Sequence, residues 1–188
     1  MITLPPLSDN ESQRLSKLNS LCILDTNPES QYDDITTIAS QICQVPIALI
    51  SLVDQNRQWF KSKVGLEVDE TTREVAFCAY AILKPKELLI IPDATKDERV
   101  KDNPLVTGKP HIRFYAGIPI VIDNQYAIGT LCVIDSKPRK LNQEQINGLK
   151  ALGHQVETQL NLVKTNQELE FVNQELKQFA YTASHDLK

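Results

Sequence analysis

The fold of this chain is decided by two neighbouring apolar runs, Ile112-Arg113-Phe114-Tyr115-Ala116-Gly117-Ile118-Pro119-Ile120-Val121-Ile122 and Tyr126-Ala127-Ile128-Gly129-Thr130-Leu131-Cys132-Val133-Ile134-Asp135. Both runs are rich in β-branched and aromatic residues, which favour strands. Because only Asp123-Asn124-Gln125 separates them, we predict an antiparallel hairpin. Gly117 and Gly129 lie inside the runs, where glycine marks a bulge or a close backbone approach, and Pro119 indicates an edge or a bulge.

A second hairpin is expected nearer the N-terminus. Residues 47–53 form a short apolar run typical of a buried strand, and residues 57–64 partly alternate before Gly65. Residues 88–91 predict one more strand. The adjacent antiparallel strands exclude a sheet in which strands and helices simply alternate along the chain.

Helical spacing of apolar residues marks the remaining segments. Ser8 and Glu11 fit a capping box at the start of the first of these helices. The fold class is therefore α+β, an antiparallel sheet flanked by helices and followed by a long C-terminal helix. The predicted helices cover residues 8–20, 28–43, 75–83 and everything from residue 142 onward.

Four separate sequence motifs, listed below in chain order, resemble those of a GAF domain, a small sensory fold. The resemblance covers about residues 22–160 and implies a central antiparallel sheet of five to six strands with helices on its faces. It also implies a pocket enclosed by the sheet and the long polar connection of residues 94–111. The motifs are Phe77-Cys78-Ala79-Tyr80-Ala81-Ile82, Asp102-Asn103-Pro104-Leu105-Val106, Ile112-Arg113-Phe114-Tyr115-Ala116-Gly117-Ile118-Pro119 and Ile128-Gly129-Thr130-Leu131-Cys132-Val133-Ile134-Asp135, with Pro138-Arg139 after them.

The pocket that this resemblance implies would bind a small molecule. An equal alternative is that the same aromatic side chains only fill the core, because pocket walls and cores use the same residue types. Arg113 and Tyr115 are expected to project to one face, since side chains alternate along a strand. The candidate lining residues are Trp59, Phe77, Cys78, Tyr80, Asp93, Arg113 and Tyr115.

The sequence does not name a ligand or cofactor for this pocket. GAF domains that bind a bilin covalently carry a cysteine beside a histidine before the fourth strand, and His111 has no such neighbour. This argues against a covalent bilin. No phosphate-cradling backbone motif favours a cyclic nucleotide, and haem binding through His111 has no support. The three histidines and four cysteines lie far apart without CxxC spacing, so no metal site is expected.

Composition limits the remaining classes of function. The 188 residues carry a net charge of −4, which does not favour nucleic acid or an acidic membrane surface. No apolar run approaches the roughly 18 residues of a membrane span. The N-terminus lacks the features of a signal peptide. We therefore expect a cytoplasmic protein.

Apolar residues recur at alternating spacings of three and four in the C-terminal segment, and this heptad pattern predicts a coiled coil. Such a narrow stripe on a helix beyond the domain requires a partner helix, and a parallel homodimer is the expected solution. The alternative is that the stripe packs back on its own domain. We divide the chain into an N-terminal helical segment (residues 1–21), a GAF domain (22–160) and a signalling helix (161–188). The stripe consists of Leu162, Thr165, Leu169, Val172, Leu176, Phe179 and Ala183.

The last five residues, Ser184-His185-Asp186-Leu187-Lys188, resemble the phosphoacceptor box of sensor histidine kinases. The resemblance implies that His185 accepts a phosphoryl group and that Asp186 orients the imidazole ring or takes its proton. Since no ATP-binding motif is present, we expect the chain itself not to be an enzyme and to continue beyond Lys188.

These features predict the sensory input portion of a cytoplasmic two-component histidine kinase. Its partners would be a second copy, the missing kinase catalytic domain and the receiver domain of a response regulator. The main alternative is a ligand-free GAF module for dimerisation and protein interaction. A GAF enzyme such as a methionine sulfoxide reductase would need clustered reactive cysteines, and the only candidates, Cys78 and Cys132, are expected to be buried.

Overall fold

A computed structural model describes the backbone of residues 3–185 and the side chains of residues 3–182. One six-stranded sheet, with all its strand pairs antiparallel, forms the centre of the molecule in the order β3-β2-β1-β6-β5-β4. This confirms the predicted α+β class. The strands are β1 (Ile47–Val53), β2 (Arg57–Val64), β3 (Glu70–Thr72), β4 (Leu89–Ile91), β5 (Phe114–Ile122) and β6 (Tyr126–Asp135).

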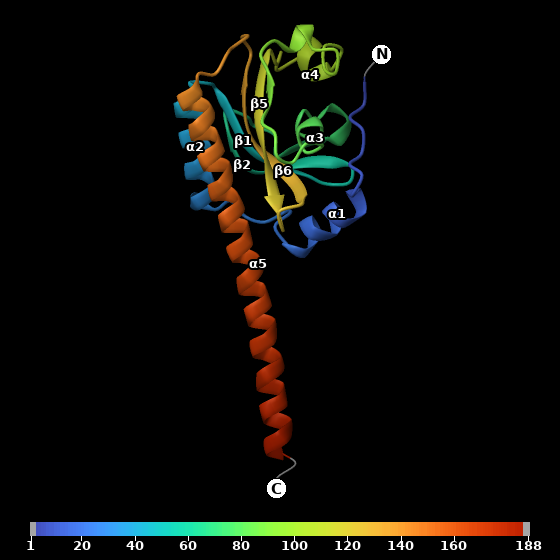
Figure 1. Ribbon diagram of the computed structural model, residues 1–188, viewed down its shortest axis with the longest axis vertical. Helices are drawn as coiled ribbons and strands as arrows, with labels where there is room; N and C mark the ends of the chain where they lie inside the picture. The colour runs from blue at the N-terminus through green and yellow to red at the C-terminus, as the bar shows by residue number, and fades with distance from the viewer. Residues whose placement is uncertain (1–2, 186–188) are drawn as a thin grey trace.

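The helices divide between the two faces of the sheet (Figure 1). On one face α2 (Ser30–Cys43) lies beside the first half of α5 (Gln143–His185). On the other face lie two single-turn helices, α3 (Cys78–Ala81) and α4 (Pro104–Thr107). The first helix, α1 (Glu11–Ser20), contacts β6. Two short 3-10 helices, η1 (Arg73–Val75) and η2 (Ala94–Lys96), complete the connections.

Alternation along the strands produces two cores, one on each face. In β1, Ile50 and Leu52 face the core under α2 and α5, whereas Leu49 and Val53 face the core under α3. Both faces of β1 are therefore covered, which explains why its sequence is apolar at every position except Ser51 rather than alternating.

Two bulges interrupt the central ladders. In the β5–β6 pair, Ile120 is opposite Gly129 and Val121 is opposite Ala127, so Ile128 is an extra residue. A Cβ atom on Gly129 would lie 2.1 Å from the Ser51 carbonyl oxygen, which confirms the expected close approach. Pro119 lies just before this bulge, where β4 no longer pairs with β5.

An ion network attaches α1 to the sheet. The carboxylate of Glu11 accepts hydrogen bonds from Arg14 (Nη2–Oε1, 2.6 Å) and from Arg73 (Nη1–Oε1, 2.6 Å). Arg14 is almost fully buried and also donates to the carbonyl oxygen of Val53 at the end of β1 (2.6 Å). Burial raises the pKa of the Glu11 carboxyl, but the hydrogen bonds from the two guanidinium groups hold it far below its usual range.

The last helix, α5, is continuous over 43 residues and about 65 Å long. Its first half is buried on the sheet through Leu149, Val156 and Leu160, and its second half extends away from the domain (Figure 1). Within residues 3–185, no helix combines the length and apolar character needed to cross a membrane.

Candidate functional site

A small cavity of about 80 Å³ lies between the sheet and the connections that carry α3 and α4. Phe77, Cys78 and Tyr115, all predicted lining residues, meet here. The rings of Phe77 and Tyr115 are 5.4 Å apart and tilted by 37°. The other lining residues are Ile47, Leu49, Gln58, Phe60, Leu66, Val68, Thr71, Leu105, Pro110, Ile112 and Ile134.

The cavity is far smaller than the roughly 300 Å³ at which ordinary ligand pockets begin. Its wall is mainly apolar, with side-chain amide and hydroxyl groups contributed by Gln58 and Thr71. Gln58 Nε2 donates to Thr71 Oγ1 (2.7 Å), and Gln58 Oε1 accepts from Ser51 Oγ (3.2 Å). The polar groups of the wall therefore already bond to other protein groups.

Cys78 lies at the inner end of this cavity and contacts a second cysteine. Its Sγ accepts hydrogen bonds from Thr130 Oγ1 (3.0 Å) and from the Tyr115 hydroxyl (3.4 Å), and lies 3.8 Å from Cys132 Sγ. Burial raises the pKa of the Cys78 thiol, but the hydrogen bonds from Cys132 and the two hydroxyls outweigh this and lower it below its ordinary value. The neighbouring sulfur and burial together raise the pKa of Cys132 well above its ordinary value.

Two of the predicted pocket residues make structural contacts instead. The hydroxyl of Tyr80 donates to the carbonyl oxygens of Thr3 (2.8 Å) and Arg99 (3.1 Å), which joins α3 to the N-terminal segment. Arg113 Nη1 donates to the carbonyl oxygen of Val106 at 2.8 Å, which secures α4 against the start of β5. Neither residue lines the 80 Å³ cavity.

Trp59 and Asp93 lie away from the cavity altogether. Trp59 is buried in the core on the opposite face, under α2 and α5, because its neighbours Gln58 and Phe60 on β2 occupy the cavity side. Asp93 caps η2. Its Oδ1 accepts two hydrogen bonds from Thr95, one from the backbone nitrogen (3.2 Å) and one from the side-chain hydroxyl (2.7 Å). The structure therefore brings together only three of the seven predicted lining residues.

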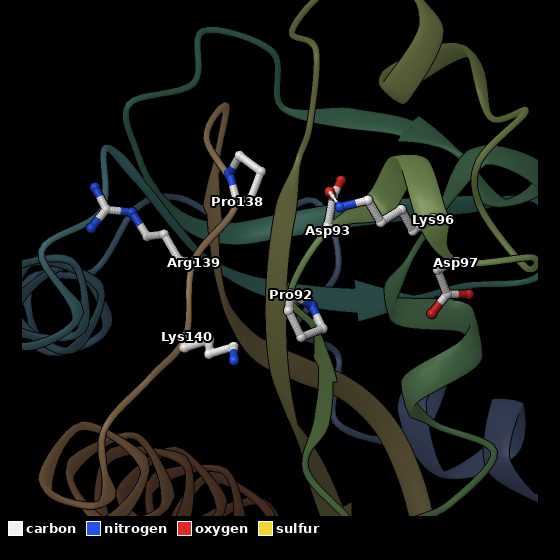
Figure 2. A pocket seen from close by; sticks show the side chains of 7 residues that line it. All are labelled: Pro92, Asp93, Lys96, Asp97, Pro138, Arg139 and Lys140. Atoms are coloured by element: carbon white, nitrogen blue, oxygen red, sulfur yellow. Dashed lines mark ion pairs between the residues drawn. The ribbon is translucent and has the colours of Figure 1, made fainter.

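Asp93 borders a wider surface hollow of about 580 Å³ at the end of β4 (Figure 2). Lys96 pairs with Asp93 on one side of the hollow (Nζ–Oδ2, 3.0 Å), and Arg139, on the other side, pairs with Asp135 at the end of β6. A backbone hydrogen bond from Arg139 to Pro92 (3.1 Å) joins the two walls. The lining residues are Pro92, Asp93, Lys96, Asp97, Pro138, Arg139 and Lys140.

The predicted stripe on α5 is exposed throughout its described length. Leu162, Leu169, Val172, Leu176 and Phe179 are 58–71% exposed. On another side of the same helix, Lys164 pairs with Asp123 (2.8 Å) and Gln167 donates to the carbonyl oxygen of Leu21 (3.1 Å). Contacts with the domain therefore leave the stripe uncovered.

The expected phosphoacceptor residues fall at the limit of the description. His185 is the last residue of α5, and only its backbone is described. Its side chain, and the whole of Asp186, lie outside the described part of the chain. Among the residues whose side chains are described, no three histidine, cysteine or acidic groups gather in a way that could hold a metal ion.

The family model of the GAF domain matches residues 27–160. This chain belongs to the GAF domain family. It is also 43% identical over 135 residues to cyclic di-GMP phosphodiesterase PA2567 of Pseudomonas aeruginosa, an alignment that covers 72% of this chain and 23% of that protein. This chain thus spans about a quarter of the length of that relative.

Solved structures share the fold at low sequence identity. The GAF domain of Thermosynechococcus elongatus PixJ, in its blue-light absorbing form, superposes with a TM-score of 0.62 at 16% identity, covering 87% of this chain and 96% of that one. The type II free methionine-R-sulfoxide reductase of Thermoplasma acidophilum gives 0.58 at 13% identity, with 78% and 96% covered. These similarities concern the fold alone.

The contact between Cys78 and Cys132 was not predicted, although both residues were expected to be buried. They are 54 residues apart and have no local spacing in common. The available signal was alternation along β6, which places Thr130 and Cys132 on the same side of the strand.

Proposed function

We propose that this chain is a sensory input module whose domain passes a change of state along α5 to an output domain that follows it. The observation that supports this most strongly is that α5 is uninterrupted from the buried core to His185. A helix that is packed at one end and free at the other transmits displacement or rotation, because its backbone hydrogen bonds keep it stiff.

Two polar contacts connect the β5–β6 hairpin with α5. The backbone nitrogen of Val121, next to the bulge, donates to Glu157 Oε1 (2.7 Å). At the tip of the hairpin, Asp123 pairs with Lys164 (2.8 Å) and with Lys17 of α1 (2.7 Å). A shift of the hairpin would therefore displace α5 at two successive positions, Glu157 and Lys164.

The occupant that best fits the exposed stripe is a second copy of this chain. The stripe has coiled-coil spacing, and Figure 1 shows the second half of α5 clear of its own domain. In a parallel pair, Glu168 at a flanking position would face Asn173 of the other copy, and Glu175 would face Ala180. In an antiparallel pair, glutamates would face glutamates, so charge favours the parallel arrangement.

For the output, we propose that His185 is a phosphoacceptor in a two-component system. The support is the likeness of Ser184-His185-Asp186-Leu187-Lys188 to the histidine kinase box, at the end of a helix with a dimerisation stripe. A neutral imidazole nitrogen can attack phosphorus in line, and a neighbouring carboxylate can take the ring proton.

A second candidate output is cyclic di-GMP turnover. It is favoured by the 43% identity to the Pseudomonas aeruginosa phosphodiesterase. In that case α5 would lead to a phosphodiesterase domain and His185 would have no chemical role.

A third candidate is a ligand-free interaction module. It is favoured by the small size of the cavity and by the polar wall groups that already bond to one another. Such a module would dimerise through α5 in the same way, without any small-molecule signal.

The deciding experiment joins this chain to the second dimerisation helix and ATP-binding domain of a histidine kinase. Incubation with labelled ATP and magnesium should give an acid-labile, base-stable phosphate that His185→Gln abolishes. His154→Gln is the matched control, because His154 is an exposed histidine of the same helix and should not change the label. Label that persists in His185→Gln would exclude the kinase output, and cyclic di-GMP hydrolysis by the complete polypeptide would favour the second candidate.

A further inference from the structure

Two buried thiols contact each other on the α3 side of the sheet. Cys78 lies on the single-turn helix α3 and Cys132 at the centre of β6, and both are about 98% or more buried. Their sulfur atoms are 3.8 Å apart. Because a disulfide needs about 2.05 Å, an approach of about 1.8 Å would join them.

We propose that Cys78 and Cys132 form a peroxide-sensitive dithiol, with Cys78 as the reacting thiol and Cys132 as the resolving thiol. This inference does not depend on the output assigned to α5. It rests on the position of the two sulfur atoms, on the hydroxyl groups around Cys78 and on the adjoining cavity.

The surroundings of Cys78 favour its thiolate. Thr130 Oγ1 (3.0 Å) and the Tyr115 hydroxyl (3.4 Å) both donate to Cys78 Sγ, which stabilises negative charge on that sulfur. The same hydrogen bonds lower the pKa of the Cys78 thiol, which agrees with this geometry. The thiolate is the form of cysteine that attacks an oxidant.

The cavity provides room for a small oxidant. Cys78 contributes to the wall of the 80 Å³ space, whereas Cys132 does not. Since the share of one water molecule in the liquid is about 30 Å³, the space has room for a molecule of the size of hydrogen peroxide. The order of the two cysteines follows from this difference in access.

The chemistry balances with hydrogen peroxide as the oxidant. The Cys78 thiolate attacks one peroxide oxygen, the S–O bond forms, the O–O bond breaks, and the departing hydroxide takes a proton to become water. Cys132 sulfur then attacks Cys78 Sγ, the S–S bond forms, and the displaced hydroxide leaves as water with the Cys132 proton. Two thiols and one peroxide give one disulfide and two water molecules.

Oxidation would reshape the cavity side of the domain. Cys132 is held in a central strand between β1 and β5, so the single-turn helix α3 must make most of the approach. The hydrogen bonds of Thr130 and Tyr115 to Cys78 would be lost. Phe77, which precedes Cys78 and borders the cavity, would move with the helix.

The test uses the complete chain in a Cys22→Ser background, because Cys22 is the one exposed thiol among the four. The folded protein is treated with hydrogen peroxide, denatured and labelled with N-ethylmaleimide. We expect two of the three remaining thiols to be lost, and peptide mapping to find a Cys78–Cys132 disulfide. Unchanged labelling of all three thiols, or a disulfide that includes Cys43, would overturn the proposal.

Variants assign the two roles. In Cys132→Ser, a sulfenic acid on Cys78 should persist and be trapped by dimedone, whereas Cys78→Ser should leave Cys132 unreacted. Thr130→Val should slow disulfide formation about tenfold, and Thr130→Ser, which keeps the hydroxyl, should restore the rate. Equal rates in Thr130→Val and Thr130→Ser would contradict the proposed activation of Cys78. If one of these variants does not fold, the peptide mapping of the Cys78–Cys132 disulfide in the Cys22→Ser protein still tests the proposal.

Discussion

Leu149 and Leu160 lie in the first half of α5 and are almost completely buried, whereas Leu169 and Leu176, in the second half of the same helix, are 62% and 64% exposed. Within each pair the leucines are at helical spacing, so each half of the helix has an apolar side and the local pattern does not show which half is buried. The difference is the domain: Leu149 and Leu160 belong to its core, whereas the second half of α5 extends beyond the sheet (Figure 1).

This contrast separates two kinds of stability in one chain. The domain buries its apolar side chains within itself and should fold at any protein concentration. In the second half of α5, called here the distal helix, the apolar stripe is not covered by any of the described residues, and helices in proteins gain most of their stability from packing. Changes in the domain should therefore alter its free energy of unfolding, and changes in the distal helix should alter assembly.

The largest effect on the domain is expected from Gly129→Ala. The new Cβ would lie 2.1 Å from the Ser51 carbonyl oxygen, between two central strands that cannot move apart cheaply. We expect a loss of at least about 3 kcal/mol in the free energy of unfolding. Urea titration followed by the fluorescence of Trp59, the single tryptophan, measures it.

Gly148→Ala is the matched control for this substitution. Gly148 lies in α5, and its new Cβ would meet only the flexible side chain of Ile42 at 3.2 Å. Alanine is the better helix former, so stability should stay equal or rise by up to about 1 kcal/mol. Equal losses in both variants would contradict the close-approach argument.

A smaller loss is expected from Glu11→Gln, which removes the negative charge between Arg14 and Arg73. Both guanidinium groups are largely buried and would keep only carbonyl partners. We expect a loss of about 2–4 kcal/mol, again from urea titration. Glu98→Gln, which breaks an exposed pair with Lys101, should cost almost nothing.

The same carboxylate predicts a pH dependence. Because the pKa of Glu11 is lowered in the folded state, its contribution is fully present above the unfolded value of about 4.3 and is lost as pH falls further toward the folded pKa. Stability of the parent should therefore fall more steeply below about pH 4 than stability of Glu11→Gln. Parallel curves for the two proteins would show that the network does not act through this charge.

Much of the fold could be predicted because each strong element carries its own pattern. The apolar runs of β1, β5 and β6 and the periodicity of α2 and α5 all lie where the sequence indicated. The strand β3 was missed, since Glu70-Thr71-Thr72 is short and polar and forms a strand only by pairing with β2. Tertiary pairing of this kind leaves no local signal.

The candidate site could be predicted only in part for a similar reason. Phe77, Cys78 and Tyr115 meet at the cavity. Trp59 points to the core on the opposite face, because side chains alternate along β2 and its two neighbours face the cavity. A bulge at Lys61 shifts the register of β2 against β1, so counting residues along the sequence does not give the facing partner. Asp93 is used locally, as a cap, which its position after β4 did not reveal.

Asp123→Asn tests the boundary between the two regions and should have a small effect on the domain. It removes the pairs with Lys17 and Lys164, whose side chains are each about a third exposed. Pairs of this kind contribute about 0.5–1 kcal/mol in total, and less at high salt. Hydrogen exchange should show faster opening of α5 near residue 164, and a parent and variant that exchange equally there would contradict a tether at this point.

The smallest effect on the domain, and the largest on assembly, is expected from Leu169→Glu combined with Leu176→Glu. In a parallel dimer each new carboxylate would be buried opposite its counterpart, so the dimer should dissociate. The urea transition of Trp59 should move by less than about 0.5 kcal/mol, since neither leucine contacts the core. Phe171→Glu with Tyr181→Glu is the matched control, because these side chains are equally exposed on α5 but lie off the stripe. Sedimentation should therefore give a monomer for the leucine pair and a dimer for the control. A dimer in both cases would place the interface elsewhere. A parent protein that sediments as a monomer would show that a second copy of the chain does not cover the stripe.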